Sequence, residues 1–220
     1  PNPDLRWEKT KNVNVGLEMS LLQGRLHFVA DYYYRRSTDL ISQRTLPLET
    51  GFAATTINWA NMENRGVELS AGATPVKTAD WRWNTNVNVG WNTNKVLNET
   101  VAENETYPGR EGYPVGAIFA YRTAGLDSDG YPLYVAADGS TQTAKEFFKL
   151  NDYGASMLTA EEQRAQYTYM GSTDPKCSGG WLNEVTWQNV SLGVNFVFNL
   201  GAKVRVQPSY SPVYYDRGLN

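Results

Sequence analysis

Six aromatic side chains stand in polar, glycine-rich parts of the sequence, where they could stack on a sugar ring or a peptide. They are Tyr107, Tyr113, Tyr131, Tyr134, Tyr153 and Trp181. Aromatic rings suit such contacts because they combine a large rigid apolar surface with, in Tyr and Trp, a polar tip. Their neighbours are mostly Gly, Asn and Asp, which are typical of loops. We therefore expect these six residues to be candidate contacts with a substrate or a partner.

Three carboxylates, Glu18, Asp31 and Glu68, are the residues best suited to acid–base chemistry. All three fall on the polar side of segments in which apolar and polar residues alternate. A glycosidase needs two carboxylates at a fixed separation across the scissile bond, and nothing in the sequence sets a separation for these. They equally suit charges on a solvated surface or a channel wall. We expect no catalytic residue and no enzyme.

The remaining reactive residues indicate neither a cofactor nor a metal site. The segment at 127–130, Asp-Ser-Asp-Gly, resembles the start of a calcium loop, but such a loop has Gly at its sixth position and Glu at its twelfth. Here Gly130 is fourth and Asp138 is twelfth, so we expect a turn. His27 lacks a nearby nucleophile or a second nitrogen ligand. Cys177 is the only cysteine, which excludes an internal disulfide.

Alternating polarity predicts three β-hairpins, over about residues 11–35, 65–92 and 187–210. In the first, Val13, Val15 and Leu17 alternate with polar residues, which places the apolar side chains on one face. Short turns are expected at 21–24, 75–80 and 199–201, and long loops at 36–64 and 93–186. Within the second loop, Thr159 followed by two glutamates predicts one short helix over 160–169.

The unequal lengths of the connections between strands are compatible with two all-β architectures. If consecutive strands pair, the short turns all lie at one end, as in transmembrane β-barrels with short periplasmic turns and long extracellular loops. The alternative is a soluble β-sandwich, such as a carbohydrate-binding module, in which the apolar faces pack against each other. In a barrel, aromatic residues at strand ends form girdles at the membrane interfaces. Candidates for these girdles are Tyr32, Tyr34, Trp81, Trp83 and Trp91.

Composition narrows the range of partners. The 220 residues carry a net charge of -3 with scattered Lys and Arg, so we expect no nucleic acid partner.

No run of apolar residues reaches the roughly 20 that a membrane helix needs. Strands that cross a membrane give a much weaker signal, because each is about 10 residues of alternating polarity. The aromatic content of 13% suits strands.

Five groups of residues resemble, in order, motifs of the SusC/RagA family of TonB-linked outer-membrane transporters. Each group is weak alone, but as a set they are specific and span nearly the whole chain. They are NPDLRWEKT at 2–10, DYYYRRSTDLI at 31–41, NMENRGVEL at 61–69, WNTNVN at 83–88 with NKV at 94–96, and GS at 171–172 through Pro175 with GG at 179–180.

The resemblance implies that the chain is a fragment from the later part of a β-barrel of about 22 strands in the bacterial outer membrane. It implies that the full-length parent imports glycans or peptides, works with a SusD-like surface lipoprotein and receives energy through TonB. The hairpins would form barrel wall against outer-membrane lipid, and the long loops would face outside. Exposed strand edges would allow the isolated fragment to self-associate.

Overall fold

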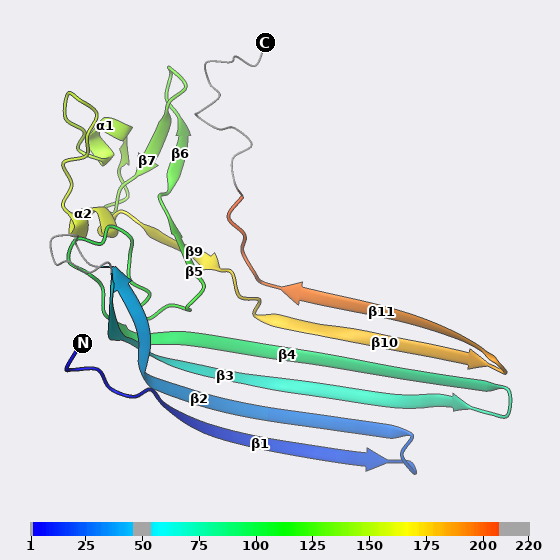
Figure 1. Ribbon diagram of the computed structural model, residues 1–220. Helices are drawn as coiled ribbons and strands as arrows, with labels where there is room; N and C mark the ends of the chain where they lie inside the picture. The colour runs from blue at the N-terminus through cyan, green and yellow to red at the C-terminus, as the bar shows by residue number, and fades with distance from the viewer. Residues whose placement is uncertain (1, 46–53, 207–220) are drawn as a thin grey trace.

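The computed structural model describes residues 2–45 and 54–206, and its main feature is a six-stranded antiparallel sheet (Figure 1). The strand order is β1-β2-β3-β4-β10-β11, so neighbours in the sheet follow the chain except where β4 meets β10. The bounds are β1 (Lys9–Leu21), β2 (Leu26–Thr45), β3 (Ala54–Lys77), β4 (Trp81–Glu99), β10 (Cys177–Trp187) and β11 (Val190–Leu200).

Three short turns lie at one end of this sheet, as Figure 1 shows. They span residues 22–25, 78–80 and 188–189. The first contains three consecutive residues with positive φ, Leu22, Gln23 and Gly24, and only the glycine adopts that conformation without steric cost. At the opposite end of the sheet β2 ends and β3 begins, and the long insertion of residues 100–176 leaves β4 there. The expected asymmetry of the two ends is therefore present.

Several expected boundaries are wrong. The long loop expected at 36–64 is mostly strand, because β2 runs to Thr45 and β3 starts at Ala54. Register shifts interrupt the pairing of these extensions, at Ser37 to Ile41 in β2 and at Asn61 and Met62 in β3, so no regular alternation of polarity marks them as strands. The third hairpin covers 177–200 rather than 187–210, and its turn is at 188–189 rather than 199–201. Glycines 179 and 180 and the polar pair at 183–184 hide the alternation of β10. The second long loop shrinks to residues 100–176.

The insertion of residues 100–176 folds into small elements, and we call it the loop module. It contains a two-stranded and a three-stranded sheet and two short helices, where one helix was expected. Helix α2 confirms the expected N-cap, since Thr159 and Glu162 form a capping box. The elements are β5 (Ala117–Ala120), β6 (Thr123–Leu126), β7 (Pro132–Val135), β8 (Thr141–Gln142), α1 (Ala144–Phe147), α2 (Ala160–Ala165) and β9 (Thr168–Ser172).

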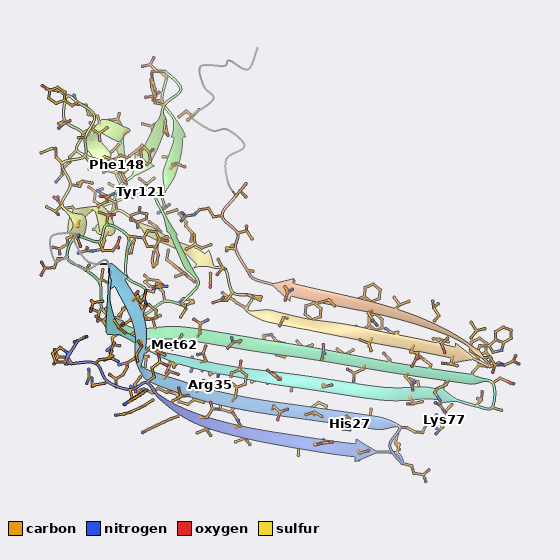
Figure 2. The ribbon with its side chains drawn as sticks, viewed as in Figure 1. His27, Arg35, Met62, Lys77, Tyr121 and Phe148 are labelled. Carbon is orange, nitrogen blue, oxygen red and sulfur yellow. The ribbon has the colours of Figure 1, made fainter. Side chains whose placement is uncertain are left out.

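Aromatic rings form the core of the loop module. Phe119 and Phe147 are 3% and 1% exposed. Tyr121 stacks on Tyr167 with ring centroids 4.2 Å apart and meets Phe148 edge-on at 5.1 Å, and Figure 2 shows Tyr121 and Phe148 together inside the module. Burial, together with a hydrogen bond to Tyr121, raises the pKa of the Tyr167 hydroxyl to about 12.

The loop module packs on the polar face of the sheet. Asn94 follows Asn92 in the polar alternation of β4, and its side chain accepts a hydrogen bond from the Val115 backbone (2.7 Å) and donates one to Asp174 (3.0 Å). Val96, on the same face, is completely buried beneath the module. Among the described residues, no helix is long and apolar enough to cross a membrane.

Candidate functional site

One face of the six-stranded sheet is uncharged and mostly apolar, with Thr85 and Asn183 as polar exceptions. The strand register aligns Val15, Tyr32, Val67 and Trp91 in one row, and the same alternation continues through β10 and β11. From this row to the short turns, none of the side chains on this face is charged. Leu192 and Phe196 are 67% and 56% exposed. Such a face needs an apolar environment to be stable.

No sheet or helix of the described residues covers this apolar face. The two small sheets belong to the loop module, on the polar side. A β-sandwich requires a second sheet packed about 10 Å away. The alternative of a soluble β-sandwich is therefore wrong for this chain.

Aromatic residues mark the two limits of the apolar face. Near the short turns, Trp81 stacks on Trp187 with centroids 5.9 Å apart. Toward the loop module, Tyr32, Tyr34 and Trp91 lie in two adjacent rows. The ten residue steps from Trp81 to Trp91 span about 33 Å along β4, or about 25 Å across a bilayer at a tilt of about 40°. That height matches the apolar band of a transmembrane barrel.

The opposite face carries small and polar side chains. Asn84, Asn86 and Asn88 alternate with the outward residues of β4. Asp31 lies directly opposite Glu68 in the β2–β3 register, and His27 Nε2 is 3.8 Å from Glu18 Oε1. Like charges at opposed positions are unfavourable in a sheet, so this face suits an aqueous or ligand-filled space.

A hollow of about 1500 Å³ opens at the loop-module end of the sheet. It lies between the ends of β2, β3 and β4 farthest from the short turns and the first part of the loop module. Trp59 of β3 and Glu99, the last residue of β4, contribute one wall. Residues 100–118 of the module contribute the other. Ser42, Gln43 and Ile57 complete the sheet side. Mixed aromatic, amide and charged groups of this kind are typical of binding sites for polar oligomers.

Glu99 organises the hollow. Its side chain is 7% exposed, and Oε1 accepts hydrogen bonds from the Trp59 indole (3.0 Å) and from Arg110 Nη2 (2.7 Å). The Arg110 backbone N–H donates to Oε2. The guanidinium also lies 4.7 Å from the centre of the Trp59 ring, a cation–π contact. One carboxylate thus fixes both an aromatic wall of the hollow and the loop that closes it.

The structure distributes the six aromatic candidates among three environments. Tyr107, Tyr113 and Tyr134 belong to the aromatic core of the loop module, and Tyr107 also lines the hollow. Tyr131 and Tyr153 are exposed at 67% and 96%. The expectation that Trp181 lies in a loop is wrong. It is part of β10, stacks on Phe196 at 5.7 Å, and belongs to the apolar face.

Sequence reasoning missed Trp59, Glu99 and Arg110. Trp59 and Glu99 were hidden because both were placed in long loops, whereas Trp59 lies within β3 and Glu99 is the last residue of β4. Arg110 is brought to Glu99 only by the fold of the module. The expected turn at 127–130 is confirmed, since Asp127 Oδ1 accepts from the N–H groups of Asp129 and Tyr131. No group of potential metal ligands occurs among the described residues.

The sheet has an uncharged outer face of membrane height and a polar inner face, with short turns at one end and a loop module at the other. These features define a wall segment of a transmembrane β-barrel. A family model described as TonB dependent receptor-like, beta-barrel, matches residues 1–218. The chain belongs to this family of bacterial outer-membrane proteins.

Characterised relatives support this assignment. The TonB-dependent receptor P3 of Formosa agariphila is 26% identical over 218 residues, which cover 92% of this chain and 21% of the relative. The TonB-dependent receptor SusC of Bacteroides thetaiotaomicron is 36% identical over 150 residues, or 60% of this chain and 15% of the relative. The chain therefore spans about a fifth or less of these proteins.

Solved structures show the same fold. A structure of the RagAB peptide transporter matches with a TM-score of 0.68 and 27% identity, covering 91% of this chain and 22% of the other. RagAB in its closed-closed state gives a TM-score of 0.69 at 27% identity with the same coverage. The all-β barrel-wall architecture expected from the sequence is thereby confirmed.

Proposed function

We propose that this chain is part of an outer-membrane TonB-dependent transporter of the SusC/RagA type that imports glycans or peptides. The main support for the proposal is that, across all six paired strands, one face of the sheet is uncharged and the other is polar. Such a wall separates lipid from a polar passage. The names of the SusC and RagAB relatives, which include a peptide transporter, support import as the task.

The hollow at the loop end is the proposed first contact for cargo. It lies on the polar side of the wall, at the end where the loop module stands, so cargo bound there has access to the passage. Trp59 offers an aromatic wall, and Glu103 and Glu105 add carboxylates around it. Aromatic surface and charged hydrogen-bonding groups together suit sugars and peptides alike.

A SusD-like surface lipoprotein and TonB are the proposed partners of the full-length protein. The loop module stands at the end of the sheet opposite the short turns, where a surface lipoprotein would dock. Tyr131 and Tyr153 are exposed there and remain our candidates for contact with that partner or with cargo. Exposed aromatic residues of this kind are common anchors of protein interfaces.

Uptake by cells that express the full-length protein tests the proposal. We expect deletion of the gene, or of TonB, to abolish uptake of a labelled oligosaccharide or oligopeptide from a cargo panel. The class of cargo that is lost identifies the substrate. If neither deletion changes uptake of any member of the panel, the import proposal is wrong.

A Trp59→Ala variant tests the hollow separately. Loss of a stacking surface should weaken cargo binding about tenfold, since such contacts contribute about 1 kcal/mol or more. Trp7→Ala is the matched control, because Trp7 is 87% exposed and lies outside the hollow. Equal cargo affinity in the two variants, at equal amounts of folded protein, would exclude the hollow as the contact site.

A further inference from the structure

A group of basic side chains lies immediately beyond the apolar face, on its loop-module side, and we call it the basic row. It consists of Lys9, Lys11, Arg36, Arg65 and Lys95, all of them exposed. Cross-strand pairing aligns Lys11 with Arg36, Arg36 with Glu63, and Glu63 with Lys95. The row thus crosses four neighbouring strands.

The basic row belongs to the outer face of the sheet. Arg36 comes two residues after Tyr34, and Lys95 four residues after Trp91, with no register shift between them. Side chains separated by an even number of residues share one face of a strand. The charges therefore stand at the aromatic limit of the apolar face, where Arg65 is paired with Tyr34, and directly above it, on the lipid side and not in the passage.

The charge of the row is largely uncompensated. Glu63 is the one acidic residue paired with members of the row, and its Oε2 accepts a hydrogen bond from the Tyr34 hydroxyl (3.2 Å). Among the described residues, the charged ends of the five basic side chains form no hydrogen bond or ion pair. The outer face below the row carries no charge at all. A basic band at this one height is complementary to an anionic partner that lies at the same height.

We propose that the basic row binds the phosphate groups of lipids in the leaflet next to the loop module. This inference rests on the proposed placement of the sheet in the outer membrane. Lipid chains would cover the apolar face, and this places their headgroups just above Tyr32, Tyr34 and Trp91. Arg and Lys bind phosphate strongly, Arg in a bidentate manner. Each basic residue near an anionic membrane surface contributes about a fivefold preference, equivalent to about 1 kcal/mol.

Lipid selectivity next to Cys177 tests this inference. Cys177 is paired with Trp91 in the register, so a fluorophore attached there reports on lipid at the edge of the row. The full-length protein, with any other cysteines replaced, is reconstituted in phosphatidylcholine vesicles. Quenching by brominated phosphatidylglycerol is compared with quenching by brominated phosphatidylcholine. We expect the anionic lipid to be preferred several-fold next to the wild-type protein.

Paired variants separate the row from general charge effects. Arg36→Gln with Lys95→Gln should remove most of this several-fold preference, so that the two brominated lipids quench nearly equally. Arg122→Gln with Lys145→Gln removes the same charges from exposed positions of the loop module and should leave it unchanged. Arg36→Lys with Lys95→Arg should retain it. All variants are compared at equal fractions of heat-modifiable, folded barrel.

Two results would overturn the inference. One is the absence of any anionic-lipid preference in the wild type, or the same preference in the row variant and its control. The other is loss of the preference when inorganic phosphate replaces chloride at equal ionic strength, which would identify free phosphate as the ligand. The assay measures lipid selectivity and no transport. Its result therefore does not depend on whether the import proposal is right, and the two can fail separately.

Discussion

Arg110 Nη2 lies 2.7 Å from Glu99 Oε1, in an ion pair that joins the last residue of β4 to the loop module. The Glu99 side chain is nearly buried, whereas that of Arg110 is 31% exposed. Glu99 also accepts a hydrogen bond from the Trp59 indole N–H, so its loss would leave donors of both Trp59 and Arg110 without their acceptor. Glu99 therefore joins the wall to the module, alongside the hydrogen bonds of Asn94.

Glu99→Gln should loosen this end of the loop module. The amide keeps the shape but loses the charge, so we expect the local opening free energy to fall by about 2 kcal/mol. Hydrogen exchange at the Arg110 and Val115 amides of the full-length protein measures this directly. Glu103→Gln, an exposed carboxylate beside the same hollow, should leave the exchange rates unchanged. Equal rates in both variants would show that Glu99 does not secure the module.

Helix α2 should lose stability in acid. A hydrogen bond from Lys149, together with the Thr159 backbone N–H, lowers the pKa of Glu162 from 4.5 to about 2. Because the folded pKa is depressed, the stabilisation is complete above about pH 4.5 and declines as the pH falls toward 2. Exchange of the α2 amides should accelerate across this window relative to other amides of the module. In Glu162→Gln, the additional acceleration should be absent, and its persistence would contradict the assignment.

Charge on the outer face should destabilise the barrel, whereas the same charge one residue away should be tolerated. Val87 lies near the middle of the apolar face, and Asn88 points to the polar side. Val87→Arg should destabilise the barrel by about 2–4 kcal/mol, the cost of a basic residue at the bilayer midplane. Asn88→Arg is the matched control. Urea titration of the full-length protein in vesicles measures both, and equal losses would contradict the orientation of the sheet.

The strongly alternating parts of the fold were predictable from sequence. The segments of β1, β2, β3 and β4 within the apolar band showed a two-residue period, because one face meets an apolar environment and the other does not. That difference of environment ends at the loop side of the band. Beyond it, the residues from Ser37 to Thr45 pair as strand, but two register shifts around Leu40 break the alternation, and periodicity carries no information there.

The candidate site was predictable only in part. That the loop aromatics contact a substrate or a partner stays a prediction. Tyr107 and Tyr134 lie in a packed aromatic core that no spacing in the sequence reveals. Trp181 was misplaced because two glycines precede it, which suggested a loop, whereas β-pairing with β4 holds it at the apolar face. The contact of Glu99 with Arg110 depends on the path of residues 100–109 and on no local pattern.

The orientation of the sheet is the central claim, and site-directed spin labelling along β4 tests it most directly. Single cysteines at 83–90 are introduced into the full-length protein after replacement of Cys177, labelled with a nitroxide, and reconstituted in vesicles. The label's collision rates with oxygen, which is enriched in lipid, and with a water-soluble nickel complex are then measured. We predict a period of two, with high oxygen contact and low nickel contact at Trp83, Thr85, Val87 and Val89. Alternation of the opposite phase, or no alternation, would contradict the account.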